Sequence, residues 1–156
     1  MFYDASRKFI LSYFLNFIFL YLSVKIKFKA IILIFGTGID IIEVDRVEKQ
    51  ISNNNGFKED IFTKREIEYC ESKKNKAQHF AARFAAKEAF FKALGTGWRD
   101  GMGFIEIEIL NNELGKPEIE LHGETKKFSE KQNISNIHVS LSHIKKIVTA
   151  IITLEK

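Results

Sequence analysis

A chain of 156 residues with 46% hydrophobic residues is long enough to bury one core, so we expect a single domain. Its one cysteine, Cys70, excludes an internal disulfide and is typical of a reducing compartment, where a buried thiol is usually inert. The net charge of +4 favours an anionic partner, but no run of five basic residues, zinc-ligand spacing or P-loop motif identifies that partner.

The first segment, residues 1–32, differs in composition from everything after it. Phe9–Val24 is mostly apolar, lies between basic residues, and is shorter than the roughly 20 residues that span a bilayer. No small-residue cleavage site of a signal peptide follows it. We expect residues 1–32 to be dispensable. They would not belong to the natural product if translation began at Leu33, which fits a UUG start codon; a membrane anchor is the alternative.

Ile31–Gly38 is a short apolar run that closes in glycines, which predicts a buried strand. The next polar residue, Asp40, has two open interpretations. It is either the N-cap of a helix with Glu43 at the third position, or a functional carboxylate. The helix would end in the turn-forming residues Ser52–Gly56. Its apolar side would consist of Ile41, Val44, Val47 and Ile51.

Two more helices are predicted in the middle of the chain. The motif Thr63-x-x-Glu66 is a capping box, so a helix begins there and runs to about Lys73. A longer, central helix begins near Asn75-x-x-Gln78, which is close to a capping box. It stops at Gly95, because glycine takes the left-handed conformation after a helix at low cost.

The central helix has two informative sides when it is wound at 100° per residue. One side is an apolar stripe that faces a core, made of Phe80, Phe84, Phe91 and Leu94. The other side combines Glu88 and Lys92 with the small residues Ala81 and Ala85, which leave room for something to lie flat against the helix. A surface ion pair between Glu88 and Lys92 is the simpler interpretation of this side.

The C-terminal part alternates apolar and polar residues, which predicts two pairs of antiparallel strands. We expect strands at Phe104–Leu110, Glu118–His122, Ile137–Ser142 and Ile147–Leu154, and a short polar helix at Gly123–Gln132. In the first strand, Ile105, Ile107 and Ile109 would face inward, and Glu106 and Glu108 outward. A block of helices with antiparallel strand pairs indicates an α+β fold.

Five motifs, taken in order, resemble those of the holo-acyl carrier protein synthases, the small type of 4′-phosphopantetheinyl transferase. Any one of them alone would be a weak signal, but together they cover roughly Leu33 to Leu154. The motifs are Phe35-Gly-Thr-Gly-Ile-Asp40; Phe62-Thr-x-x-Glu66; Arg83-Phe-Ala-Ala-Lys-Glu-Ala-Phe90 with Lys92-Ala-Leu-Gly-Thr-Gly97; Gly115-Lys-Pro117; and His138-Val-Ser-Leu-Ser-His143.

The resemblance implies a phosphopantetheinyl transferase fold in one domain, residues 33–156, with an antiparallel sheet packed against a long central helix. It implies transfer of the 4′-phosphopantetheine arm of coenzyme A to a serine of apo-acyl carrier protein, with release of adenosine 3′,5′-bisphosphate, in fatty acid biosynthesis. Because both substrates are soluble, we expect a cytoplasmic enzyme with no membrane partner.

The resemblance also assigns roles to individual residues. Asp40 and Glu88 match metal-binding carboxylates, a donor type that suits Mg²⁺. Glu88, directly or through a metal-bound water, is the candidate base for the attacking serine. Lys92 would neutralise the phosphates or protonate the leaving group. Contacts to coenzyme A are expected from Arg83, Gly95, Thr96, Gly97 and His143.

Two expectations concern partners. Arg46 matches a position that docks on the acidic helix of the carrier protein, although neighbouring acidic residues make its own helix less basic than this role suggests. The resemblance alone also implies a homotrimer with coenzyme A between adjacent subunits, so that Arg83 and His143 reach the ligand from a different chain than Asp40 does.

The alternative is a non-catalytic basic module that binds RNA or a membrane surface. An RNA-binding sheet presents aromatic residues beside basic ones on its strands. Here Glu106 and Glu108 occupy such positions, so we expect no nucleic-acid partner.

Overall fold

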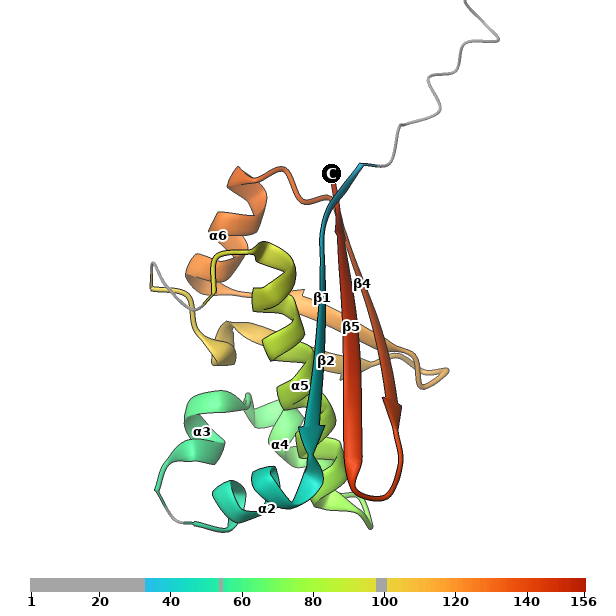
Figure 1. The fold of residues 1–156 in the computed structure, drawn as a ribbon. Helices are drawn as coiled ribbons and strands as arrows, with labels where there is room; N and C mark the ends of the chain where they lie inside the picture. The colour runs from blue at the N-terminus through green and yellow to red at the C-terminus, as the bar shows by residue number, and fades with distance from the viewer. Residues whose placement is uncertain (1–32, 54, 98–100) are drawn as a thin grey trace, which may run out of the picture. The chain divides into compact units, whose positions relative to one another are not determined.

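The computed structural model describes residues 33–53, 55–97 and 101–156, and Leu33–Lys156 forms one compact unit. The predicted extension, residues 1–32, lies outside the described residues. The elements are β1 (Ile34–Glu43), α2 (Val44–Ser52), α3 (Phe57–Ile61), α4 (Lys64–Glu71), α5 (Lys76–Leu94), the 3₁₀ turn η1 (Phe104–Glu106), β2 (Ile107–Asn111), β3 (Pro117–Leu121), α6 (Gly123–Lys131), β4 (Asn136–His143) and β5 (Ile147–Glu155). Helices and antiparallel strands confirm the α+β prediction (Figure 1). Among these helices, none is long and apolar enough to cross a membrane.

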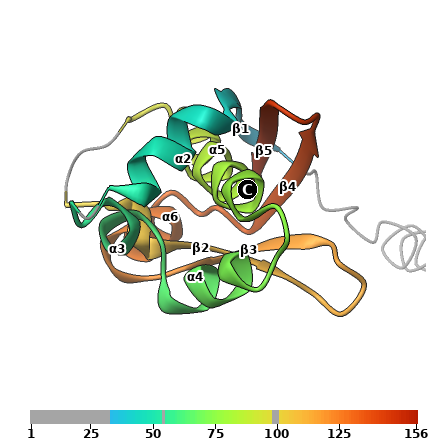
Figure 2. The ribbon, with the colours of Figure 1, turned by 90° about the horizontal axis from the view of Figure 1, so that it is seen from below.

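Three strands form the main sheet in the order β1-β5-β4, with antiparallel neighbours. The central helix α5 packs against β1 and β5, and in Figure 2 it is seen nearly along its axis, between this sheet and the separate β2–β3 pair. The sheet face turned toward α5 supplies core residues such as Ile42 and Ile152, which are buried. The opposite face leaves Ile39, Ile41 and Ile151 exposed, so this sheet has apolar residues on both sides.

Strand β1 extends through the glycines instead of ending at them, which corrects the predicted strand end at Gly38. A Cβ atom at Gly36 would collide with the carbonyl oxygen of Ala93, and one at Gly38 with the carbonyl oxygen of Ala89. The glycines therefore let β1 lie directly against the backbone of α5. As a result, Asp40 lies within the strand, and its interpretation as a helix cap is wrong; α2 is preceded by Glu43, whose side chain makes no capping bond.

The alanines of α5 are covered by the protein itself. Ala81 and Ala85 are fully buried, and Ala89 and Ala93 meet β1, so the interpretation that Ala81 and Ala85 leave an open surface is wrong. Small side chains on this helix instead permit close packing of helix and sheet. The predicted end of the helix is confirmed, because Gly95 follows it in the left-handed conformation with φ 71°. The Asn75 capping box is wrong, since the Asn75 side chain makes no capping bond.

The β2–β3 pair differs from the prediction in which residues it buries. Residues 104–106 form a turn, and Ile105 is exposed there. Glu106 caps the next helix, accepting the N–H groups of Glu124 and Thr125 at 3.0 and 2.9 Å. Glu108, expected to face solvent, is buried, and its carboxylate accepts a hydrogen bond from the Thr63 hydroxyl at 2.5 Å.

A buried ion pair ties α5 to the surrounding elements. The ammonium of Lys87 is fully buried and donates to Glu66 Oε2 at 2.7 Å, to the carbonyl of Ile61 at 2.7 Å and to the carbonyl of Phe104 at 3.0 Å. The confirmed capping box of α4 lies in the same network, because Glu66 also accepts the N–H of Thr63. Burial lowers the pKa of Lys87, and the charge of Glu66 opposes that effect. Lys87 thereby fixes the rotation of α5 about its axis.

Candidate active site

Three predicted site residues come together where β1 crosses α5. Asp40 lies on β1 on the side that faces the helix, and Glu88 and Lys92 lie one turn apart on α5. The ammonium of Lys92 donates to Asp40 Oδ1 at 2.8 Å. The predicted ion pair between Lys92 and Glu88 is therefore wrong, since Lys92 pairs across to the strand. The glycine-permitted contact of β1 with α5 is what brings the three side chains together.

Glu88 differs electrostatically from Asp40. Burial raises the pKa of Glu88, and the nearby charge of Asp40 raises it further, while Lys92 opposes the shift. The described residues offer Glu88 no hydrogen bond or ion pair of its own. A half-buried carboxylate next to a second one is suited to hold a cation or to accept a proton.

The donor chemistry of this group fits a hard divalent cation. Two carboxylates plus ligand oxygens and waters are a usual environment for Mg²⁺. A cation there would offset the negative charges of the two carboxylates, whose repulsion adds to burial in raising the pKa of Glu88. The site residues present are therefore compatible with Mg²⁺.

Arg83 lies on a different side of α5. Nine residues separate it from Lys92, which places the two on opposite faces of a helix with 100° per residue. The guanidinium is buried, donates to Asn111 Oδ1 at 2.9 Å and stacks 4.1 Å over the Tyr69 ring. Its Nε is buried and has no partner among the described residues. The same side chain lines a cavity of about 440 Å³ with Asn111 and Tyr69.

His143 belongs with Arg83 rather than with Asp40. It is exposed at the end of β4. Burial lowers the pKa of His79 on α5, and the positive charges of Arg83, Lys73 and His143 lower it further. Four basic groups thus lie close together on one side of the molecule. Within one chain, the predicted site residues form two groups, an acidic one with Lys92 and a basic one around His79.

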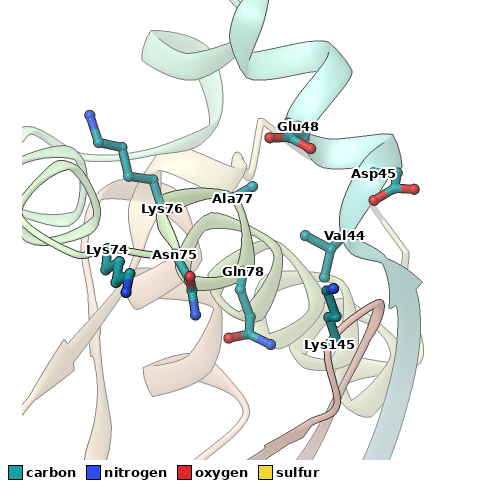
Figure 3. A pocket seen from close by; sticks show the side chains of 9 residues that line it. All are labelled: Val44, Asp45, Glu48, Lys74, Asn75, Lys76, Ala77, Gln78 and Lys145. Atoms are coloured by element: carbon teal, nitrogen blue, oxygen red, sulfur yellow. The ribbon is translucent and has the colours of Figure 1, made fainter.

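The predicted carrier-docking residue, Arg46, is exposed on α2. The same helix contributes Asp45 and Glu48 to one wall of a cavity of about 630 Å³, which Lys145 lines from the β4–β5 turn (Figure 3). Figure 3 also shows Lys74, Asn75, Lys76, Ala77 and Gln78, from the start of α5 and the residues before it, around this cavity. The surface beside Arg46 therefore has both signs of charge.

Gly95, Thr96 and Gly97 follow α5 as predicted. Gly95 and Gly97 both have left-handed backbone, with φ 71° and 64°, and a side chain at either would meet no atom within 4 Å. The conformation rather than crowding requires glycine here. This segment begins three residues after Lys92, where α5 ends.

The sequence reasoning missed a second group of metal-type donors. Glu108, Glu120 and His122 have donor atoms within 4.8 Å of one another. Glu108 is already engaged, by the Thr63 hydroxyl and by the guanidinium of Arg65 at 3.1 Å. A cation there would have to replace Arg65. The alternation of Glu118, Glu120 and His122 along β3 could have indicated that these side chains share a face.

Comparison with known proteins places these features in a family. Residues 36–151 match the model of the 4′-phosphopantetheinyl transferase superfamily. The holo-[acyl-carrier-protein] synthase of Geotalea daltonii is 47% identical over 125 residues, which are 80% of this chain and the whole of that protein.

Solved structures show the same similarity. The holo-[acyl-carrier-protein] synthase of Neisseria meningitidis has a TM-score of 0.74 at 35% identity, covering 80% of this chain and all of that one. The Bacillus anthracis synthase, solved in complex with CoA (3′,5′-ADP), has a TM-score of 0.66 at 37% identity, covering 79% of this chain and 97% of that one.

Proposed function

We propose which residues carry out the reaction of this chain, which belongs to the 4′-phosphopantetheinyl transferase superfamily. The chain transfers the 4′-phosphopantetheine arm of coenzyme A to a serine of apo-acyl carrier protein, the reaction that yields holo-acyl carrier protein. Asp40, Glu88 and Lys92 are the proposed reaction centre. The observation that carries this assignment is their convergence where β1 meets α5, with Lys92 2.8 Å from Asp40.

Asp40 and Glu88 would hold Mg²⁺, which offsets charge on the pyrophosphate of coenzyme A when it is bound. Glu88, whose pKa is raised by burial and by Asp40, accepts the proton of the serine hydroxyl directly or through a water. The serine oxygen forms a bond to the phosphorus that carries the pantetheine arm. The pyrophosphate P–O bond breaks, and its electron pair leaves with adenosine 3′,5′-bisphosphate. Lys92 neutralises or protonates that leaving phosphate.

The basic group is proposed to bind coenzyme A. Arg83, with an unpartnered Nε beside a cavity, and the exposed His143 suit phosphate oxygens. Gly95, Thr96 and Gly97, at the end of α5, would let backbone approach the cofactor near Lys92. Arg46 would meet an acidic helix of the carrier protein, as an exposed cation on α2.

The homotrimer is proposed from the family resemblance, and the separation of the two groups supports an active site shared between subunits. Arg83 and His143 lie apart from Asp40 within one chain, and a neighbouring chain could supply the missing half. The outward sheet face supports the same proposal, because Ile39, Ile41 and Ile151 are 62%, 68% and 43% exposed there. Exposed apolar patches of this kind are typical of interaction surfaces.

We also propose that the enzyme acts in the cytoplasm, in agreement with its single, buried cysteine. Burial raises the pKa of Cys70 to about 12, so the thiol stays protonated and unreactive. The alternative of a non-catalytic binding module is disfavoured, because the family is one of transferases.

The test of the reaction centre is transfer to apo-carrier protein, followed by mass spectrometry of the carrier with coenzyme A and Mg²⁺ present. Asp40→Ala and Glu88→Ala should each lower the rate by at least about a thousandfold, since each removes a ligand of the cation and Glu88 also the base. Both variants should keep the wild-type melting temperature within a few degrees. Glu130→Ala, at an exposed position on α6, is the matched control. A near-normal rate in either variant would contradict the assignment.

A further inference from the structure

The ion pair between Lys92 and Asp40 assigns Lys92 a role before any substrate binds. Its partner Asp40 has a side chain only 13% exposed, whereas that of Lys92 is 52% exposed. Glu88 is the other carboxylate at this point, and it has no ion pair among the described residues. Among the described residues, the ammonium of Lys92 therefore pairs with one member of this carboxylate pair, Asp40, and leaves the other without an ion pair.

The Asp40 oxygen that accepts the ammonium is an atom that a cation would use. Two acidic side chains held close together repel each other unless a positive charge lies between or beside them. Lys92 supplies that charge in the chain described here. A divalent cation on the Asp40 carboxylate would lie close to the ammonium that Asp40 Oδ1 accepts, and the two positive charges would repel each other. Metal binding at Asp40 therefore weakens the ion pair and favours departure of the ammonium.

The released ammonium has a natural new partner. Lys92 has four rotatable side-chain bonds, a half-exposed head and three donors, so it can swing without unfolding α5. Phosphate oxygens of coenzyme A would lie next to the cation that displaced it. The ammonium of Lys92 would then pair with a phosphate of coenzyme A instead of with the carboxylate of Asp40.

We propose that Lys92 is the resident counterion of the metal-free site, and that it exchanges Asp40 for a phosphate of coenzyme A when the divalent cation binds. This inference rests on the proposed function, because it takes Asp40 as a metal ligand. It has a thermodynamic consequence that does not follow from a plain phosphate-binding lysine. The lysine opposes metal binding in the absence of coenzyme A and favours it in its presence, so the two ligands bind with positive coupling.

The test measures Mn²⁺ affinity by the electron paramagnetic resonance signal of the free ion, with and without coenzyme A, at low ionic strength. Lys92→Met removes the competitor while keeping most of the side-chain length. A unit positive charge within about 4–6 Å of a carboxylate lowers its pKa by roughly 1–3 units, which is a tenfold or larger loss of proton affinity, and we expect a loss of at least similar size for a metal cation. Mn²⁺ alone should therefore bind Lys92→Met about tenfold more tightly than the wild type, and coenzyme A should improve Mn²⁺ affinity less in the variant.

Lys131→Met is the control, because Lys131 is exposed on α6. It should leave Mn²⁺ affinity unchanged. A second readout follows the lysine itself: the ¹⁵N signal of the Lys92 ammonium, assigned with Lys92→Met, should shift when Mg²⁺ is added without coenzyme A and shift again when coenzyme A follows.

The outcomes separate this inference from the proposed function. Mn²⁺ binding that is lost in Asp40→Asn but equal in wild type and Lys92→Met would overturn the counterion exchange and leave the metal site standing. An ammonium signal that does not move when Mg²⁺ binds would overturn it as well. Mn²⁺ binding that persists unchanged in Asp40→Asn would overturn both.

Discussion

At the scale of single residues, β1 turns a carboxylate toward the helix and two isoleucines outward, which is the reverse of the usual placement. Asp40 faces α5, where a core residue is expected, while Ile39 and Ile41 face outward at 62% and 68% exposure. Alternation in a strand tells which residues share a face but not which face is buried. From the sequence, Ile41 is expected on the apolar side of a helix, and Asp40 is expected either as its cap or as a functional carboxylate. The inversion becomes intelligible when the inward face is a reaction centre and the outward face a contact surface.

The buried pair of Lys87 and Glu66 gives a prediction about stability. Lys87→Met should lower the free energy of unfolding by roughly 3–5 kcal/mol, because it leaves the carboxylate of Glu66 buried without its cation. The double variant Lys87→Met, Glu66→Gln should recover part of that loss, since a neutral amide replaces the unpaired charge. Urea unfolding followed by circular dichroism measures both values.

Lys131→Met serves as control for the loss of a lysine and should change the unfolding free energy by less than about 0.5 kcal/mol. Equal stability of Lys87→Met and the wild type would mean that the pair does not anchor α5. If the double variant were less stable than the single one, the loss would come from the hydrogen bonds of Glu66 to Thr63 and Ile109 rather than from its charge.

At the scale of elements, sequence reasoning predicted most helices and strands but not how closely they pack. Helix ends marked by Thr63 and Gly95 were predictable, because caps are local. The extent of β1 was not, because glycine ordinarily ends a strand and here it admits a neighbouring helix. Nor was the burial of Glu108, since its partners Thr63 and Arg65 come from a distant helix.

For the proposed site, some features were likewise predictable from the sequence and others were not. Asp40, Glu88, Lys92, Arg83 and His143 could all be named from the motifs. The resemblance also implied their grouping, Asp40 with Glu88 and Arg83 with His143. Residue spacing alone could not predict it, because the grouping depends on which strand lies against which side of α5. The choice of Asp40 rather than Glu88 as the partner of Lys92 is a tertiary contact across 52 residues of chain, and helix spacing favours the wrong partner.

The close contact of β1 with α5 predicts a strong effect of a single methyl group. Gly38→Ala would place its Cβ against the carbonyl oxygen of Ala89, which is rigid helix backbone. Relief requires β1 to move away from α5, so we expect a loss of about 1–3 kcal/mol in unfolding free energy together with a large loss of activity, because Asp40 moves with the strand. Thermal unfolding and the carrier-modification assay measure the two effects.

Gly103→Ala is the matched control for this change. Gly103 has φ −138°, and a Cβ there would meet no atom within 4 Å. It should therefore keep both stability and transfer. Full activity and wild-type stability in Gly38→Ala would show that the contact between strand and helix does not position Asp40.

At the scale of the whole molecule, the separation of the acidic and basic groups allows a complementation test. Asp40→Ala removes the acidic half of the site, and His143→Ala removes an exposed residue of the basic half. Each variant alone should form the same oligomer by light scattering and transfer slowly at low coenzyme A concentration. If each site takes Asp40 from one chain and His143 from a neighbour, co-expression of the two variants regenerates intact sites.

The expected recovery follows from counting. With equal amounts of the two chains mixed at random, a given site receives an intact Asp40 from one subunit and an intact His143 from the other about one time in four. Co-expressed chains that carry two different affinity tags, purified on both, should therefore show roughly a quarter or more of wild-type activity. A site built within one chain predicts no recovery at all, because every chain in the mixture carries one of the two defects. An active monomer in light scattering would exclude the shared site by itself, and then Arg83 and His143 would need another role on the side of α5 that faces away from Lys92.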